Sequence, residues 1–294
     1  MTFRQWLLAA ISLLLLGLPA FAAERKVDPS FLHRNTDALV EVSSDITTPS
    51  CHFKPMFGAG GGALAKTSGV ARFAEVVVDP HGSCKTVSYP QEDQIYVVLN
   101  GHGASSYGGQ DVSLANEDFL YIPATVSHGL RNDTGAPMTV AVMGYHTQGF
   151  PAGPLPGHPL KDNIANVPLE HVGSHPQSAH YRLLLGDSSQ TRDKIDVGSV
   201  VTSLFLMEID PGGTNFPHHH PREEEIYLIL SGHGTQVAGS GLDGVEGKFP
   251  AGAGDAYYYR ANTTVGYYSA ANVSSRILCI RSWRPGLQPE HRAK

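Results

Sequence analysis

The feature that most constrains the fold of this chain is an internal repeat. Residues 91–103 read Gln-Glu-Asp-Gln-Ile-Tyr-Val-Val-Leu-Asn-Gly-His-Gly, and residues 222–234 read Arg-Glu-Glu-Glu-Ile-Tyr-Leu-Ile-Leu-Ser-Gly-His-Gly. The offset from Gln91 to Arg222 is 131 residues. Further along, residues 117–122 match residues 254–259 at an offset of 137. This period is too long for a solenoid, so we infer two copies of one folding unit.

Each copy contains short runs of Val, Ile, Tyr and Leu separated by Gly, Pro, Asn and Asp, a pattern typical of β-strands. The predicted strands cover residues 70–78, 95–99, 119–122 and 138–145 in the first copy, and 200–209, 226–230, 256–259 and 276–283 in the second. Outside possible short turns in a linker, the mature chain has no helical periodicity. We therefore predict an all-β fold of two antiparallel units, each a small barrel or a double-sheet jelly roll.

The N-terminus resembles a secretory signal peptide. Arg4 precedes an apolar stretch from Trp6 to Leu18, which is short for a membrane span, and an Ala-Phe-Ala site ends at Ala22. We predict cleavage after Ala22 and export to the periplasm or the extracellular space, with an uncleaved anchor as the alternative. The predicted organisation is a signal peptide (1–22), an N-terminal arm (23–65), a first unit (66–147), a Pro/Gly-rich linker (148–178), a second unit (179–287) and a tail (288–294).

Charge and cysteine content exclude some partners and leave others open. The formal net charge is -6, and basic clusters are lacking, which argues against nucleic acid as a partner. After signal cleavage no membrane partner is expected either. Export would permit one disulfide bond among Cys51, Cys84 and Cys279, but the pairing is not determined by the sequence. None of the three has a second cysteine at the spacing of a metal site.

The second copy carries a group of metal-binding side chains at fixed spacing. The pattern is Gly212-x5-His218-x-His220-x4-Glu225-x6-Gly232. Residues two apart on a strand point to the same face, so His218 and His220 can aim at one point while His219 faces outward. Two imidazoles and one carboxylate, with open positions, suit a divalent ion such as Fe(II). The alternative is a polar surface loop.

These residues resemble the cupin superfamily, whose first motif the stretch Gly212 to Gly232 matches throughout. Because the resemblance covers both copies, the chain looks like a two-domain bicupin. This resemblance implies two tandem jelly-roll barrels and a metal ion in the mouth of a barrel. Mn(II) or Fe(II) is the expected cofactor, with Zn, Ni and Cu as alternatives.

The two copies are unequal with respect to the ligands that the resemblance implies. In the first copy, Val87, Tyr89 and Gln94 align with the two histidines and the glutamate, although His128 of the second motif is present. We therefore expect the first barrel to be metal-free and structural. In the second copy, the family's fourth ligand, a histidine, aligns with Val265.

Two residues near Val265 are candidates for catalysis. Tyr267 should share the face of Val265 and either approach the metal or pack in the barrel. Arg260 is the nearest fixed cation in the sequence, and it either pairs with a substrate carboxylate or lies at the surface. We expect Glu223 and Glu224, next to the glutamate of the motif, to form a solvated turn.

The leading functional hypothesis is a secreted metal-dependent enzyme of oxygenase or decarboxylase type, an oxidoreductase or lyase, acting on a small oxygen-rich organic molecule. A first alternative is a hydrolase like the (S)-ureidoglycine aminohydrolases, which the stretch from Arg260 to Ser269 also resembles. A second is a non-catalytic cupin that binds or stores a small molecule. A homo-oligomer is compatible with each hypothesis. The sequence leaves open the substrate, the reaction, the metal and the oligomeric state.

Overall fold

The computed structural model describes residues 30–61, 67–151, 156–239 and 246–287. The predicted signal peptide and tail lie outside these residues. The described part is almost entirely β-structure, interrupted by two short 3-10 turns, η1 (Thr36–Ala38) and η3 (Ile164–Asn166). It contains no helix of sufficient length and apolarity to cross a membrane.

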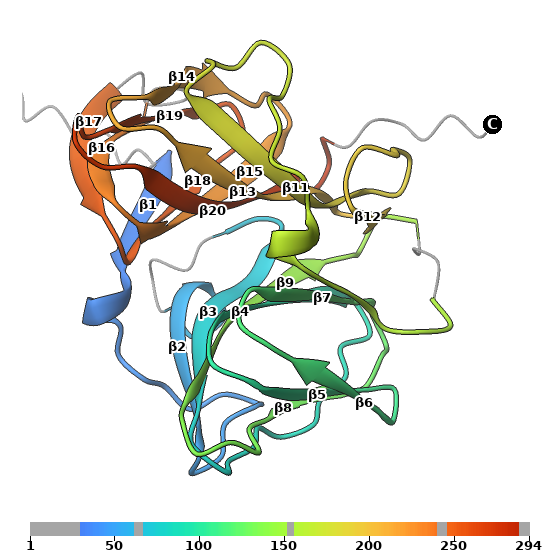
Figure 1. The fold of residues 1–294 in the computed structure, drawn as a ribbon. Helices are drawn as coiled ribbons and strands as arrows, with labels where there is room; N and C mark the ends of the chain where they lie inside the picture. Colours follow the sequence, from blue (N-terminus) through green and yellow to red (C-terminus); the bar gives the residue numbers. More distant parts are fainter. Residues whose placement is uncertain (1–29, 62–66, 152–155, 240–245, 288–294) are drawn as a thin grey trace, which may run out of the picture.

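The first unit consists of two sheets (Figure 1). The larger has the order β10-β7-β4-β9-β3-β2, and the smaller has the order β6-β5-β8. The strand bounds are β2 (Cys51–Gly58), β3 (Val70–Val78), β4 (Glu92–Asn100), β5 (Gly103–Tyr107), β6 (Gln110–Leu114), β7 (Asp118–Ile122), β8 (His128–Arg131), β9 (Met138–His146) and β10 (Leu160–Asn163).

The second unit repeats this arrangement. Its larger sheet has the order β1-β18-β15-β20-β13-β11-β12, and its smaller sheet has the order β14-β19-β16-β17. The bounds are β1 (Phe31–Asn35), β11 (Ala179–Asp187), β12 (Ile195–Gly198), β13 (Val201–Ile209), β14 (Thr214–His219), β15 (Glu223–Ser231), β16 (His233–Gly239), β17 (Glu246–Gly252), β18 (Asp255–Tyr259), β19 (Thr264–Ser269) and β20 (Ser275–Trp283).

The predicted all-β duplication is confirmed, with two corrections. Each strand predicted from the sequence is present, and equivalent strands occupy equivalent places in the two large sheets. The sheets do not close into barrels, however, so each unit is a double-sheet jelly roll. In addition, β12 pairs parallel to β11, whereas only antiparallel pairing was predicted.

The two units exchange strands reciprocally. β1, from the predicted N-terminal arm, pairs with β18 of the second unit, and Figure 1 shows this blue strand among the orange and red strands. β10, from the predicted linker, pairs with β7 of the first unit. Each exchanged strand ends in an asparagine, Asn35 or Asn163, whose side chain caps the 3-10 turn that follows. The repeat therefore extends into the arm and the linker.

Both faces of each large sheet are buried, which explains the continuous apolar runs of the central strands. In β15, Tyr227 and Ile229 belong to the core between the two sheets of the second unit. Ile226 and Leu228, on the opposite face, join a core shared with residues of the first unit. The equivalent strand β4 divides its side chains in the same way. The described residues therefore form three cores, one inside each unit and one between the units.

Glu224 and Asp93 occupy equivalent positions at the face between the units. Glu224 accepts hydrogen bonds from the Tyr258 hydroxyl (2.6 Å) and from the backbone amide of Gly69 (2.8 Å) in the first unit. Asp93 accepts from the Tyr121 hydroxyl (2.9 Å). The prediction that Glu223 and Glu224 form a solvated turn was wrong: both lie in β15, and Glu224 is buried. The hydrogen bonds from Tyr258 and Gly69 compensate for the burial of the Glu224 carboxyl group at the contact between the units.

Cys51 and Cys84 form a disulfide bond in the first unit, and Cys279 is free and buried in the second. The bond joins the start of β2 to the segment that follows β3, which are 33 residues apart in the chain. The structure thereby settles the pairing that the sequence left open.

Candidate metal centre

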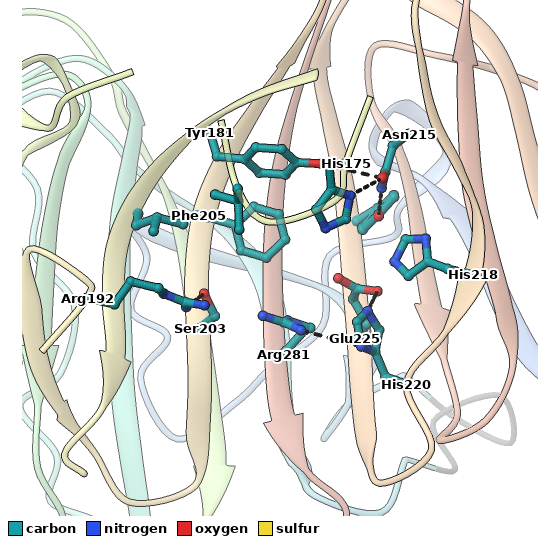
Figure 2. Close-up of a pocket in the computed structure, with 13 residues that line it drawn as sticks. His175, Tyr181, Arg192, Ser203, Phe205, Asn215, His218, His220, Glu225 and Arg281 are labelled. Carbon is teal, nitrogen blue, oxygen red and sulfur yellow. Dashed lines mark hydrogen bonds and ion pairs between the residues drawn. The ribbon is translucent and has the colours of Figure 1, made fainter. Parts of the chain in front are cut away.

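The structure brings His218, His220 and Glu225 together in the second unit. Their metal-binding atoms all lie within 4.8 Å of one another. His218 and the residue after it lie on β14, His220 follows that strand, and Glu225 lies on β15. His219 is exposed between the two inward histidines, as predicted. The rings of His218 and His220 stand nearly perpendicular, with centroids 4.9 Å apart (Figure 2).

Nδ1 of each imidazole lies next to a polar group of the protein. Nδ1 of His218 lies 2.7 Å from the carbonyl oxygen of Phe216, which can only accept, so this nitrogen carries the proton. Nε2 of His218 then keeps its lone pair for an ion. Nδ1 of His220 lies 3.6 Å from Glu223 Oε2 and 3.4 Å from Arg281 Nη1. Burial lowers the pKa of His218 and lowers that of His220 to about 3, so both rings are neutral.

The Glu225 carboxyl group is buried and only partly satisfied. It is 3% exposed, and its Oε2 has no hydrogen-bond partner among the described residues. His220 Nε2 lies 3.5 Å from this oxygen, which is long for a hydrogen bond. Burial raises the pKa of Glu225 to about 8, against the opposing effect of Arg281. Two neutral imidazoles and a buried carboxyl oxygen without a donor fit a divalent cation, which would satisfy that oxygen.

Arg281 is a functional candidate that the sequence analysis missed. It lies on β20 directly opposite Glu225, and its guanidinium borders the cluster (Figure 2). Its Nε has no hydrogen-bond partner among the described residues. The alternation of β20 could have identified it, since Ile277 and Cys279 face the core of the second unit and Arg281 follows in the same period.

His175 and Asn215 are further site residues that the sequence analysis did not identify. His175 comes from the linker, and its Nδ1 lies 3.0 Å from Asn215 Oδ1. Asn215 is buried in β14, where a register shift between Asn215 and His218 lets both side chains face the same interior. Asn215 also donates to the Tyr227 hydroxyl at 2.9 Å. No local pattern around His175 marks it as a site residue.

These side chains surround a small cavity. Its volume is about 30 Å³, enough for an ion or one to two water-sized groups. Its polar lining consists of the cluster, His175, Asn215, Ser203 and two arginines, Arg281 and Arg192. The rest of its lining is aliphatic or aromatic and comes from Val172, Tyr181, Leu183, Phe205 and Tyr227. A cavity of this size and composition suits a small polar molecule rather than a bulky one.

The two catalytic candidates from the sequence lie elsewhere. Tyr267 is fully buried and its hydroxyl lies 3.0 Å from Ser275 Oγ, so it packs in the core of the second unit. Arg260 does not line the cavity, and Arg281 takes the place that was expected for it. Val265 is buried directly opposite His218 in the β14–β19 pair and supplies no donor atom.

In the first unit, a buried arginine lies beside the residues that align with the cluster. The Arg72 guanidinium lies 3.1 Å from Asp45 and 3.3 Å from Glu92, and it donates to the Tyr89 hydroxyl at 2.7 Å. Gln94 is buried and donates to Glu92 at 2.9 Å. In the first unit, the Arg72 side chain therefore supplies a positive charge at the place that corresponds to the cluster.

The two units place an arginine at this site from different strands: Arg72 comes from β3 in the first unit, and Arg281 comes from β20 in the second. In β9 of the first unit, Gly144 stands opposite Gln94, at the place of Arg281, and leaves room for the Arg72 side chain. In β13 of the second unit, Ser203 aligns with Arg72 and lines the cavity. His128 is buried, with Nδ1 bonded to the Val126 carbonyl at 2.8 Å, as expected for a histidine that packs in the fold.

The sequence and the fold were compared with known proteins. The family model of the cupin domain matches residues 74–144 and 205–281, just over half of the chain. A search of curated protein sequences gave no match.

Among solved structures, a glyoxylate-induced protein from Pseudomonas aeruginosa is similar with a TM-score of 0.68 and 15% identity, covering 93% of this chain and 96% of that one. The protein YlbA from E. coli has a TM-score of 0.64 and 13% identity, covering 91% and 97%. Oxalate decarboxylase from Bacillus subtilis, a protein with Mn(II) centres, has a TM-score of 0.62 and 12% identity, covering 86% and 76%.

Proposed function

Because the chain belongs to the cupin family and carries two cupin domains, we propose that it is an exported metal-dependent enzyme with its active site in the second unit. The observation that carries this proposal is the convergence of His218, His220 and Glu225 within 4.8 Å in one small cavity. Side chains of this kind rarely gather in a buried place without a shared ligand, because each carries a desolvation cost.

His218, His220 and Glu225 would hold the ion, and Mn(II) or Fe(II) suits this ligand set. The Mn(II) centres of the structurally similar oxalate decarboxylase support the first of these two ions. When bound, such an ion supplies Lewis acidity and orients substrate oxygens. The hydrogen bond to Phe216 orients the His218 ring in advance, and Glu223 and Arg281 border the His220 ring.

The chemistry of the cavity lining favours a small carboxylic acid as the substrate. Arg281 offers a guanidinium with an unpaired N–H at the edge of the cluster, and a planar fork binds carboxylates well. Phe205 and Leu183 add apolar surface to the lining of the same cavity. We propose decarboxylation as the first reaction class to test, with oxygenation as the second.

The test is a screen of the Mn(II)-loaded protein against small acids, phenols and ureides, with CO₂ release, oxygen uptake and ammonia release as readouts. CO₂ release from a small acid supports the proposal. Ammonia release from a ureide would instead favour the hydrolase alternative. Tight ligand binding without turnover, at full metal occupancy, would favour the binding or storage role.

Replacing Arg281 with glutamine is expected to lower kcat/KM for a carboxylate substrate by about 100-fold, because a charge-assisted contact in a buried site is lost. The assay uses saturating Mn(II), so that metal occupancy stays complete. Arg276→Gln is the matched control, since Arg276 lies on the same strand but pairs with Glu117 at 2.9 Å, away from the cluster. Equal losses in both variants would contradict the role of Arg281.

Export is part of the proposal. The signal-peptide pattern at residues 1–22 and the Cys51–Cys84 disulfide support it, because disulfides persist in oxidising compartments. N-terminal sequencing of the protein recovered from the periplasm or medium is expected to begin at Ala23. A cytoplasmic protein that retains Met1 would contradict this part of the proposal.

A further inference from the structure

The proposed metal site lacks one imidazole at the place where the sequence alignment expects it. That place is Val265, which faces His218 across the β14–β19 pair and is apolar and buried. The cluster of His218, His220 and Glu225 therefore supplies three donor atoms. A further imidazole for this site would have to come from another part of the chain.

His175 lies above the cluster on the linker, just before β11. It lines the same cavity, and its ring stands nearly perpendicular to that of His218, with centroids 5.7 Å apart. Its ring also contacts Tyr181, with centroids 5.1 Å apart. Figure 2 shows His175 between Tyr181 on one side and Glu225 and His218 on the other.

The hydrogen bonds of Asn215 fix the tautomer of His175. Asn215 donates through Nδ2 to the Tyr227 hydroxyl and accepts through Oδ1 from the Tyr181 hydroxyl, 3.4 Å away. Oδ1 can only accept, so Nδ1 of His175 carries the proton in their 3.0 Å hydrogen bond. Nε2 of His175 then has a free lone pair, and in Figure 2 this nitrogen lies on the side of the cluster.

We propose that His175 is the fourth protein ligand of the metal in the second unit and replaces the imidazole that is missing at Val265. Asn215 acts as the positioning residue that holds the ring by its other nitrogen, the usual arrangement for a histidine that binds a metal. The inference rests on the proposed metal site. If His175 binds the ion, the linker contributes a ligand to that site.

The experiment compares wild type with His175→Ala and His175→Gln. Titration with Mn(II) measures the Kd, and pulsed EPR of the Mn(II)-loaded proteins counts the coordinated imidazoles. We expect three imidazoles in wild type and two in both variants, with a Kd raised by at least about tenfold. His171→Ala is the matched control, because His171 is on the same linker and packs against His180, away from the cavity.

The possible outcomes separate this inference from the proposed function. If wild type binds Mn(II) with two imidazoles, or if the His175 variants keep the Kd of wild type, the role of His175 is overturned and the three-ligand site remains. If wild type binds no metal ion, the proposed function fails as well. Should a variant fail to fold, the imidazole count of wild type alone decides, three supporting the inference and two overturning it.

Discussion

Simultaneous replacement of His218 and His220 with alanine is expected to abolish stoichiometric metal binding while leaving the fold intact. Of the three residues in the cluster, the variant keeps only Glu225. Metal binding is lost because a site needs several converging donors to compete with water for the ion. Neither histidine belongs to a hydrophobic core, so the three cores are unaffected. Elemental analysis should fall from about one equivalent of metal per chain to about a tenth or less.

The matched control for this variant is His219→Ala. His219 lies between the two histidines but is exposed and points away from the cavity. It should retain the metal content of wild type. Unchanged far-ultraviolet circular dichroism would show that the double variant is folded. Stoichiometric metal in the folded double variant would refute the assignment of the site.

Metal affinity is expected to rise with pH up to about pH 8. The pKa of Glu225 is about 8 because the carboxyl group is buried, so the metal-free protein holds this proton at neutral pH. At neutral pH a metal ion has to displace this proton, whereas burial lowers the pKa of His218 and His220 and favours their neutral forms. The association constant for Mn(II) should therefore increase nearly tenfold for each pH unit well below 8, and about 50-fold in all from pH 6 to pH 8.

Calorimetry in buffers of different ionisation enthalpy measures the proton that is released. About one proton per ion is expected below pH 7 and none well above pH 8. Proton release that stays constant from pH 6 to pH 9 would show that Glu225 is already ionised or is not a ligand.

The same raised pKa predicts the pH dependence of stability in the metal-free protein. The folded state holds a proton that the unfolded chain loses above about pH 4.5, so protonation favours the folded state. This contribution is complete below pH 4.5 and is lost as the pH rises to about 8. The free energy of unfolding of wild type relative to Glu225→Gln should decrease over this range. If the difference in unfolding free energy between wild type and Glu225→Gln does not change with pH, the raised pKa of Glu225 is contradicted.

The regular part of the fold was predictable because local pattern and repeat agree. Val70–Val78 has the same bounds in the sequence prediction and in β3. The run Ile226–Leu230 was also identified as strand, and its lack of alternation has a reason that the sequence did not provide. One face of β15 packs inside the second unit, and the other packs against the first unit.

The errors share one cause, which is that each depends on packing between segments distant in the chain. Glu224 looked like part of a solvated turn because charged residues cluster there, but the contact between the units buries it with Tyr258 and Gly69 as donors. The strand exchange of β1 and β10 was missed because the local sequence of a short strand does not determine which sheet edge it pairs with. The closed barrel was expected from family resemblance, and the sheets remain separate.

By itself, the sequence determined the duplication, the central strands of the two large sheets and the positions of His218, His220 and Glu225, because strand periodicity and ligand spacing act over a few residues. Only the tertiary structure decided which other side chains complete the site. Arg281 reaches Glu225 because β20 pairs with β15, and His175 reaches the cavity because the linker folds over it. Alternation along β20 indicates the inward face of Arg281, but the residues that it and His175 contact depend on how distant segments of the chain pack together.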